Sequence, residues 1–254
     1  MDRIEVIADM IMESRQTVVF TGAGISTESG ISDFRSPGGI WSRFDPDEYT
    51  FQKFLASETS REKYWAMLAS TWPEMSAAEP NSGHYAIAGL YRIGKLDCVI
   101  TQNIDGLHQK SGIPEDRVIE LHGTAYRVNC LECGQRYPRD EIQKRVTVGE
   151  KVPRCVCGGI MKPATISFGQ AMPERETREA ERRSAACDLF LVAGSSLVIY
   201  PAAQMPLIAH QGGARLVIIN MEATPHDRYA DAVLHEKTGE AFPAIMARVQ
   251  EKTR

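Results

Sequence analysis

Four short runs of β-branched and other apolar residues constrain the fold of this chain most. They span residues 17–20, 96–103, 189–196 and 215–220. Segments with helical patterns flank them at 80–93, 173–186, 202–211 and 239–249. Buried strands that alternate with helices are typical of a parallel sheet covered on both faces. We therefore predict an α/β fold with a Rossmann-like, doubly wound parallel sheet.

A polar, turn-rich segment between the second and third runs contains two close cysteine pairs. The pairs are Cys130-x2-Cys133 and Cys155-x-Cys157, with 21 residues between them. Four thiolates on two such turns match the tetrahedral ligand set of a structural zinc site. Disulfides are disfavoured in a reducing compartment, and a redox pair would leave the second pair without a role. We predict one structural zinc ion, although His122 or another nearby residue in place of one ligand remains open.

Composition and charge bear on the partners and the location. The net charge is −4, with 24% charged residues, so no polybasic surface favours nucleic acid or an anionic membrane. The N-terminal segment has helical spacing and early acidic residues, unlike a signal peptide. No apolar run approaches the roughly 18 residues that cross a membrane. We expect a cytoplasmic protein that binds neither nucleic acid directly nor a membrane.

The glycine-rich sequence "FTGAGISTESGISDFRS" follows the first run. Gly22 and Gly24 would let the backbone approach a phosphate, and we expect a helix to begin after them. The dinucleotide fingerprint is incomplete, because Thr27 stands where the third small residue would be. A turn that serves only packing is the alternative. An acid, an aromatic ring and a cation then share one loop, which favours a ligand site: Asp33, Phe34 and Arg35.

Polar residues also end the second run, in "VITQNIDGLHQKSG". Gln102, Asn103 and Asp105 would lie at the carboxyl edge of the sheet, where open α/β sheets bind ligands. The alternative is that Asn103 or Asp105 only caps the next helix.

A histidine follows in "VIELHGTAYRVNC". His122 precedes Gly123, which leaves room for a substrate, and an imidazole pKa of roughly 6.5 suits a general base near neutral pH. A purely structural histidine is the alternative.

The ordered set of motifs resembles the sirtuins, the NAD-consuming protein-lysine deacylases. The motifs are "GAGISTESGISDFR", "TQNID", "LHG", the two cysteine pairs, "FGQ", "GSSL" and "IN", and the resemblance covers about residues 18–242. It implies a single catalytic domain over 1–254. The large Rossmann-like part would comprise about 1–35, 76–124 and 165–254. The small module would comprise about 36–75, which is helical, and 125–164, the zinc ribbon.

The motifs and the resemblance together imply roles for individual residues. His122 would act as the general base on the nicotinamide ribose, with Asn103 as the second catalytic residue. The predicted NAD-binding residues are Gly22, Ala23, Gly24, Thr27, Asp33, Phe34, Arg35, Gln102, Asn103, Ile104, Asp105, Gly194, Ser195, Ser196, Asn220, Glu222 and Thr238. The predicted acyl-lysine site comprises Phe168, Gly169 and Val198, with Leu68 and Thr71 on the helix lining the acyl pocket. The substrate peptide would add as a strand.

The resemblance also implies the reaction. The acyl-lysine oxygen would attack C1′ of the nicotinamide ribose, giving nicotinamide, O-acyl-ADP-ribose and free lysine. NAD would be a consumed co-substrate, and acyl-lysine proteins or peptides would be the partners. Three departures from the family pattern are Ser32 for proline, Gln170 for glutamate and the short second cysteine pair.

The acyl preference and three other functions remain to be considered. Sirtuins that favour acidic acyl groups carry a tyrosine and an arginine three residues apart. Leu68 and Thr71, or Tyr64 and Met67 in the other alignment, lack the arginine, so we expect neutral acyl groups to be preferred over succinyl. The alternatives are a protein mono-ADP-ribosyltransferase, an NAD(P) oxidoreductase and a non-enzymatic zinc-ribbon binding module.

Overall fold

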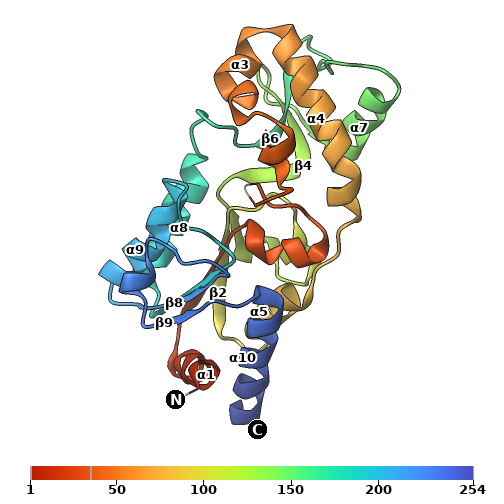
Figure 1. Ribbon diagram of the computed structural model, residues 1–254. Coiled ribbons are helices and arrows are strands. Elements are labelled where there is room, and N and C mark those ends of the chain that lie inside the picture. Colours follow the sequence, from red (N-terminus) through yellow and green to blue (C-terminus); the bar gives the residue numbers. More distant parts are fainter. Residues whose placement is uncertain (1, 35, 254) are drawn as a thin grey trace.

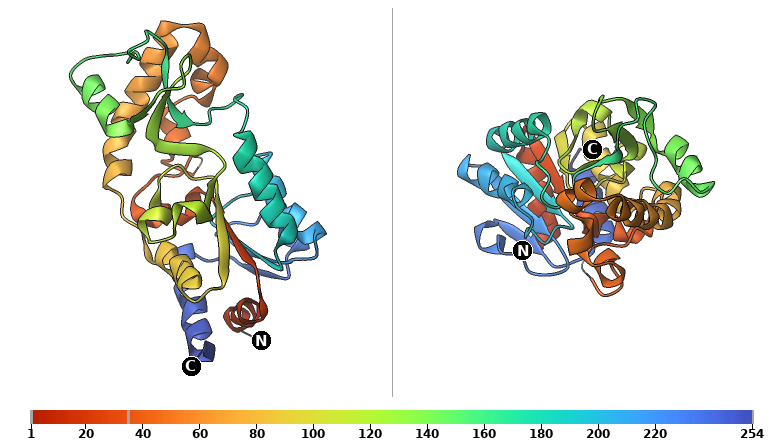
Figure 2. Two further views of the ribbon diagram at one scale, coloured as in Figure 1. Left: turned by 180° about the vertical axis from the view of Figure 1, so that it is seen from behind. Right: turned by 90° about the horizontal axis from the view of Figure 1, so that it is seen from above.

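The computed structural model describes residues 2–34 and 36–253. Two parts lie one above the other in Figure 1. The lower part is a six-stranded sheet with helices on both faces, and the upper part is a three-stranded sheet with its own helices. The left view of Figure 2, from behind, shows the same separation of the parts. The predicted division into residue ranges stays a prediction.

All strand pairs of the main sheet are parallel, and the strand order is β3-β2-β1-β7-β8-β9. The strands are β1 (Thr17–Thr21), β2 (Leu96–Thr101), β3 (Val118–Glu120), β7 (Leu189–Ala193), β8 (Arg215–Ile219) and β9 (Ala232–Leu234). The four predicted runs form the central strands, and the predicted Rossmann-like fold is confirmed. The strand order reverses between β1 and β7, which makes this the topological switch point of the sheet.

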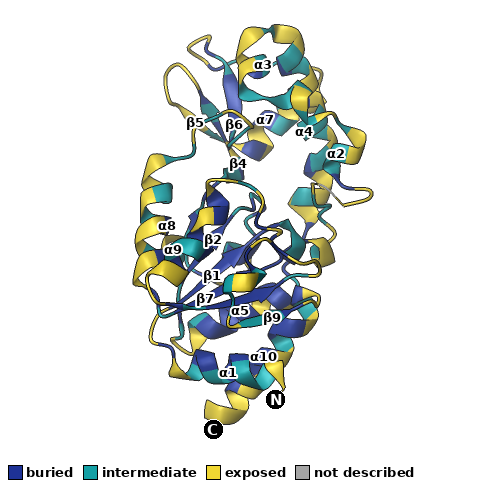
Figure 3. Ribbon diagram, turned by 60° about the vertical axis from the view of Figure 1, so that its left-hand side comes forward, coloured by how far each residue is buried: buried dark blue, intermediate teal, exposed yellow. Residues whose placement is uncertain are grey.

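Helices cover both faces of the sheet because consecutive side chains of each strand point to opposite sides. Val19 packs with α1 (Arg3–Glu13), α5 (Ser82–Arg92) and α10 (Thr238–Thr253). Val18 and Phe20 pack with α8 (Glu174–Ala186) and α9 (Met205–Gln211). Figure 3 shows the strands as a buried layer between the helices. The two apolar cores, one on each face, hold the strands in place and so fix the carboxyl edge of the sheet, where the predicted polar residues lie.

The small part is built around an antiparallel sheet of order β5-β4-β6. Its strands are β4 (Gly123–Cys130), β5 (Arg136–Pro138) and β6 (Met161–Thr165), and its helices are α2 (Ile40–Arg43), α3 (Phe51–Ala56), α4 (Glu58–Ala77) and α7 (Arg139–Thr147). Trp65, Val128, Ile142 and Met161 form a small separate core. The Arg139 guanidinium lies over the Trp65 and Trp72 rings, 5.3 and 4.9 Å from their centres.

Local structure departs from the sequence predictions in three places. The helix expected after "TGAG" is absent from the described residues there, and two 3₁₀ turns, η1 (Ala23–Ile25) and η2 (Thr27–Ser29), replace it. Gly30, with φ of 83°, ends the second turn before an α-helix can form. The segment 36–75 was expected to be helical, but its first part, residues 36–50, contains only the short α2 and the turn η3 (Pro46–Tyr49). The rest of that segment is interrupted at Ser57, whose Oγ accepts a hydrogen bond from Ser60 N at 3.1 Å and so begins a second helix.

The remaining elements are short: α6 (Leu107–Lys110), η4 (Glu115–Arg117), η5 (Ala202–Gln204) and η6 (Asp227–Tyr229). The strands β3 and β9 were not predicted, because three residues are too few to show a pattern. Among the described residues, no helix combines the length and apolar character needed to span a bilayer.

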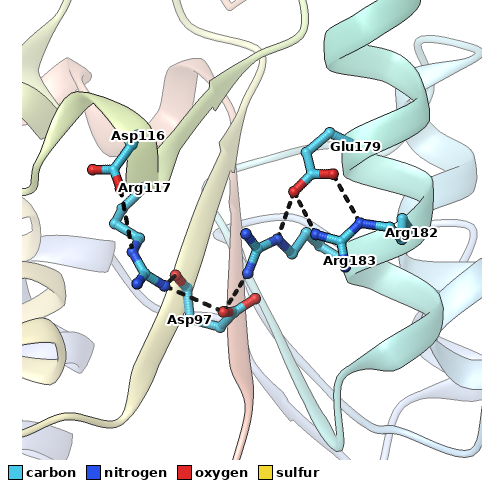
Figure 4. Close-up of polar contacts among 6 residues, drawn as sticks. All are labelled: Asp97, Asp116, Arg117, Glu179, Arg182 and Arg183. Atoms are coloured by element: carbon cyan, nitrogen blue, oxygen red, sulfur yellow. Dashed lines mark hydrogen bonds and ion pairs between the residues drawn. The ribbon is translucent and has the colours of Figure 1, made fainter.

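Charged side chains gather at the amino edge of the sheet, away from the strand ends that carry the predicted site. Asp97 pairs with Arg117 and with Arg183 of α8, at 3.5 and 2.5 Å, and Glu179 pairs with Arg183 (Figure 4). A cavity of about 300 Å³ beside Asp97 and Arg117 contains none of the predicted site residues. This edge ties α8 to β2, and we assign it no ligand.

Candidate functional site

Glycines bring the turns after β1 and β7 into direct contact at the switch point. Gly24 N donates to Gly194 O at 2.9 Å, and Gly22 N donates to Ala193 O at 3.1 Å. A Cβ on Gly22 or Gly24 would lie 2.8 Å from Gly194 O, and one on Gly194 would lie 2.4 Å from Ile25 N. The glycines therefore permit a close approach of two backbone turns, as the packing alternative expected. Their predicted contact with a pyrophosphate stays a prediction.

A buried hydrogen-bond network joins the ends of β1 and β2. Asn103 Nδ2 donates to Gly22 O at 3.1 Å and to Ser26 Oγ at 3.0 Å. Ser26 Oγ in turn donates to Asp105 Oδ2 at 2.7 Å. Three polar side chains from two loops thus converge in a buried environment, where each hydrogen bond orients the next.

Asp105 serves two purposes at once. Its Oδ1 accepts a hydrogen bond from Leu107 N at 3.0 Å, but the N-cap position of α6 is occupied by Gly106, so neither Asn103 nor Asp105 is the predicted N-cap. Its Oδ2 faces Ser26 in the network. Burial raises the pKa of the Asp105 carboxyl, and the hydrogen bonds from Leu107 and Ser26 oppose that rise. The result is a buried carboxyl group with both oxygens fixed in place.

His122 is held so that one ring nitrogen is left to accept a proton. His122 Nδ1 lies 3.0 Å from Gln102 O, and a carbonyl oxygen only accepts, so Nδ1 carries the hydrogen and Nε2 has the free lone pair. Burial lowers the pKa of His122, and the Gln102 carbonyl partly opposes this. The imidazole is therefore neutral near pH 7, which is the state that a general base needs.

The backbone around His122 fixes its position from two sides. His122 O accepts from Ile166 N at 2.9 Å, and Leu121 N donates to Thr101 O at 2.9 Å. Gly123 has φ of 70°, and a Cβ there would lie 1.9 Å from Ala164 O. The histidine thus sits where the main sheet meets the β4–β6 part.

Gln102 links this edge to β7. Its Nε2 donates to Ser195 Oγ at 2.8 Å, and Ser195 is buried. Ile104 O accepts from Ala125 N at 2.9 Å. The structure therefore brings Gln102, Asn103, Asp105, Ser195 and His122 to one edge, together with the three glycines.

Two buried histidines behind the network were not recognised from the sequence. Thr21 Oγ1 donates to Thr101 Oγ1 at 2.8 Å and lies 2.9 Å from His108 Nε2. The His84 and His108 rings lie 5.0 Å apart. Burial lowers the pKa of His84 to about 4 and that of His108 well below its usual range. They are neutral core groups, and only the three-dimensional packing reveals them.

Three aromatic rings pack together near the start of α2 and join the loop before it to the predicted substrate segment. Trp41 lies between Phe34 and Phe168, with ring centres 5.7 and 5.9 Å away. Phe34 and Phe168 are both exposed. Phe51 N donates to Phe168 O at 2.9 Å, and Gln52 Nε2 donates to Gly169 O at 2.9 Å. The predicted substrate residues Phe168 and Gly169 are therefore fixed to the start of α3, and Trp41 is a contact that the sequence did not point to.

Other predicted nucleotide residues lie at the same edge or on the loop before α2. Thr27 and Asp33 border a cavity of about 260 Å³ in the loop 27–39. Asn220 Nδ2 donates to Glu222 O at 2.8 Å, and the Glu222 side chain is exposed. Thr238 follows β9 and is buried, and its Oγ1 has no hydrogen-bond partner among the described residues. Ala23 is half-buried and Ser196 exposed. Arg35 lies outside the described residues.

The four cysteines of the small part come together without a disulfide. Their Sγ atoms lie within 4.8 Å of one another, and all four are free thiols. Cys130 Sγ lies 3.6 Å from Cys157 Sγ, and Cys133 Sγ lies 3.6 Å from Cys155 Sγ. A tetrahedral zinc ion with Zn–S distances of about 2.3 Å requires sulfurs about 3.8 Å apart. The cluster has the composition and spacing of a Cys₄ zinc site, and His122 lies elsewhere, paired with Gln102.

A family comparison decides the relationship. The model of the Sir2 family matches residues 22–201. A relative from Bradyrhizobium diazoefficiens, NAD-dependent protein deacetylase 1, is 50% identical over 240 residues, or 94% of this chain and 93% of its own. The chain belongs to the Sir2 family, the sirtuins.

Solved structures extend the match to this sirtuin's whole fold. One, from a study of the mechanism and regulation of Sir2 enzymes, is 41% identical, with a TM-score of 0.89 over 99% of both chains. Another, Sir2 with a p53 peptide and NAD⁺, is 35% identical, with a TM-score of 0.87 over 98% of both chains. The predicted family is therefore confirmed.

The acyl-pocket residues of this sirtuin remain predictions. Thr71 Oγ1 donates to Met67 O at 3.2 Å within α4, and Leu68 O accepts from Arg139 Nη2 at 3.3 Å. Val198 is exposed after β7. Tyr64, by contrast, reaches toward the predicted substrate segment, with its hydroxyl 3.1 Å from Ser167 Oγ.

Proposed function

We propose that this sirtuin is an NAD-dependent protein-lysine deacylase. The observation that carries the proposal is the carboxyl edge of the sheet, where a neutral His122 with a free Nε2 lies beside the Asn103–Ser26–Asp105 network. Family membership supports it, as does the name of the Bradyrhizobium relative, an NAD-dependent protein deacetylase. The solved Sir2 complex with peptide and NAD⁺ supports the same pair of substrates.

The residues of this edge fit a dinucleotide. The buried hydroxyl of Thr238, at the adenosine end of the predicted site, is an orphaned polar atom that a ligand would satisfy. Gln102, Asn103 and Asp105 follow β2 and present amide and carboxyl groups beside the switch point, where doubly wound sheets bind nucleotides. These residues and the loop of Asp33 and Phe34 would hold NAD.

The chain's own groups then perform binding, orientation and proton transfer. When bound, NAD supplies an electrophilic C1′ carbon on its nicotinamide ribose, which takes the acyl oxygen as nicotinamide leaves. Asp105, fixed by Ser26 and Leu107, would hold the nicotinamide carboxamide. His122 Nε2 would accept a proton from a ribose hydroxyl, whose oxygen then attacks the acyl carbon; a water molecule would complete the step by releasing the lysine amine and leaving the acyl group on ADP-ribose. Phe34 and Trp41 would exclude water from the reacting carbon.

We also propose that the cysteine cluster binds one structural zinc ion. Four thiolates close the coordination sphere and leave no position for a substrate. Its work is to hold β4, β5 and β6 together, not to take part in the reaction.

Neutral acyl groups are the proposed substrates, with acetyl preferred over succinyl. Neither Leu68 and Thr71 nor Tyr64 and Met67 offers a guanidinium to a carboxylate. A succinylated peptide that reacts faster than its acetylated twin would contradict this preference.

One experiment tests the proposed function. Purified protein is incubated with NAD and an acetyl-lysine peptide, and the products are identified by mass spectrometry. We expect nicotinamide only when the peptide is present, together with O-acetyl-ADP-ribose and the free-lysine peptide. His122→Tyr should lower turnover by about 10²–10⁴-fold, the usual contribution of a general base, while the zinc content is unchanged. ADP-ribose attached to the peptide, or retained turnover in the variant, would overturn the proposal.

A further inference from the structure

The interior of the small part carries three buried positive charges. Arg61, Arg139 and Lys162 are 8%, 2% and 1% exposed. In the described part of the chain, the other buried side chain that is charged at neutral pH by its usual pKa is Asp105, which belongs to the edge of the main sheet. Buried cations are expensive unless carbonyl oxygens, rings or carboxylates surround them.

Carbonyl oxygens and aromatic rings surround these cations. Arg61 Nη1 donates to Phe54 O at 3.0 Å, and Arg139 lies between two tryptophan rings. Lys162 Nζ donates to Thr165 O at 2.5 Å and to Pro163 O at 3.4 Å. Such partners solvate a charge without cancelling it, whereas a carboxylate would cancel it; Arg139 has a nearby carboxylate in Asp140, and Lys162 has none among its contacts with the described residues.

Lys162 shows this most clearly. Its Nζ lies 5.6 Å from the centre of the Tyr64 ring and 5.9 Å from that of Phe51. Burial lowers the pKa of Lys162, and Tyr64 opposes the change. Within residues 2–34 and 36–253, its hydrogen-bond partners are the two carbonyl oxygens, with the Tyr64 ring beside them. The positive charge of the ammonium is therefore not neutralised, and in a medium of low dielectric constant it acts on other charges nearby.

The segment that Lys162 contacts leads directly to the proposed substrate site. Thr165, whose carbonyl accepts from Lys162, is paired with Gly123, the neighbour of His122. Ile166 N donates to His122 O at 2.9 Å, and Ser167 contacts Tyr64 just before the exposed Phe168. Lys162 Nζ lies 2.5 Å from Thr165 O, and the next residue's Ile166 N lies 2.9 Å from His122 O, so the lysine nitrogen of a substrate bound beside His122 would lie on the order of 10 Å from the ammonium.

We infer that Lys162 makes the acyl-lysine site selective by charge, because its ammonium repels the ammonium of unmodified lysine but not a neutral acyl-lysine. The inference rests on the proposed function. Two unit charges about 10 Å apart, at an effective dielectric constant of about 20, give roughly tenfold weaker binding of the charged side chain. The same repulsion favours release of the free-lysine product.

The burial of Lys162 also sets the limit of its role. Its ammonium donates to two carbonyl oxygens, and the side chain is 1% exposed. It therefore acts at a distance and forms no hydrogen bond to an acyl carboxylate. Lys162 is a specificity-determining residue, not a catalytic one.

Direct binding measurements test the inference. Three peptides differ only at the central residue, which is acetyl-lysine, lysine or norleucine, and dissociation constants are measured by isothermal titration calorimetry at pH 7. For the wild type we expect the lysine peptide to bind at least tenfold more weakly than the norleucine peptide. Lys162→Met should reduce the ratio of the two dissociation constants by about tenfold, because the lysine peptide binds more tightly once the repelling ammonium is gone. Lys162→Arg should keep it, as should Lys144→Met, which removes an exposed charge from α7 of the same part.

The outcomes separate this inference from the proposed function. Equal binding of the lysine and norleucine peptides to the wild type overturns the inference, whether or not Lys162→Met folds. An unchanged ratio in a folded Lys162→Met, with both peptides weakened alike, also overturns it and leaves a purely structural role. Failure of the wild type to deacetylate the acetyl-lysine peptide with NAD would instead overturn the proposed function, since the binding ratio is measured without turnover.

Discussion

The cysteine cluster and the carboxyl edge of the sheet are polar sites built in opposite ways. The cluster takes its four thiols from one stretch of chain, residues 130–157, in the turns beside β4 and β6. The carboxyl edge takes Gly22, Asn103, His122 and Ser195 from the ends of separate strands. The first site is local and the second is assembled by the strand order. A local site is visible in residue spacing, whereas an assembled one requires the topology.

The two sites also differ in what supports them. The main sheet is covered by a large apolar core on each face. The core of the small part is limited to a few large side chains, with Trp65 and Ile142 among them. A small core supplies little stability by itself, and natural small domains compensate with metals or cross-links. The proposed zinc ion therefore matters to folding, while the carboxyl edge is already held by the sheet.

Loss of one thiol should give the largest effect and should separate the two sites. Cys130→Ala leaves three ligands, and structural zinc contributes about 10–16 kcal/mol in zinc-finger peptides. We expect the variant to lose zinc and hydrogen-exchange protection in β4, β5 and β6, while β1, β2 and β7 stay protected. Cys98→Ala, at a buried cysteine outside the cluster, should keep its zinc. Full protection of β4–β6 in a metal-free variant would show that the small part folds stably without zinc.

Adding a side chain to the tight contact between the turns after β1 and β7 should lower stability, but by less than loss of the zinc ion. Gly194 has φ of 62°, and a Cβ there would meet Ile25 N at 2.4 Å. Gly194→Ala should cost about 3 kcal/mol or more, from left-handed backbone strain of about 1–2 kcal/mol plus the clash. Gly94→Ala, at the amino edge with φ of 74° and nothing within 4 Å, should show the strain alone. Urea unfolding measures both, and equal losses would contradict the tight contact between the turns.

The fold and the cysteine cluster could be predicted because their signals are local. Each buried run marks a strand by itself, and the cysteine spacing specifies a ligand set without knowledge of the sheet. The helix expected after "TGAG" failed because glycine, serine and threonine residues favour turns, and Gly30 adopts a left-handed conformation there. The strands β3 and β9 were missed because each has three residues.

The assembled parts of the site could not be read from the chain. Ser26 joins Asn103 to Asp105, and Trp41 packs between Phe34 and Phe168, but neither contact leaves a mark in local spacing. Nothing in the local sequence distinguishes Lys162 from an exposed lysine. Its burial is known only from the packing of Tyr64 and Phe51 against it. Long-range packing, not residue type, gives these side chains their roles.

The pH dependence of turnover should give the mildest change and should sharpen the contrast between the sites. Burial lowers the pKa of His122, and the base must be neutral. The value of kcat/KM should therefore stay level as pH falls to about 6.5, and then drop tenfold per unit below the lowered pKa. Between the lowered pKa of His122 and its value of about 6.5 in the unfolded chain, the folded state binds fewer protons than the unfolded chain. The free energy of unfolding therefore also falls as pH falls through this range. Zinc content measured at each pH separates protonation of His122 from loss of the metal. A midpoint above 6.5 with zinc still bound would mean that a group other than a desolvated His122 controls the acid limb.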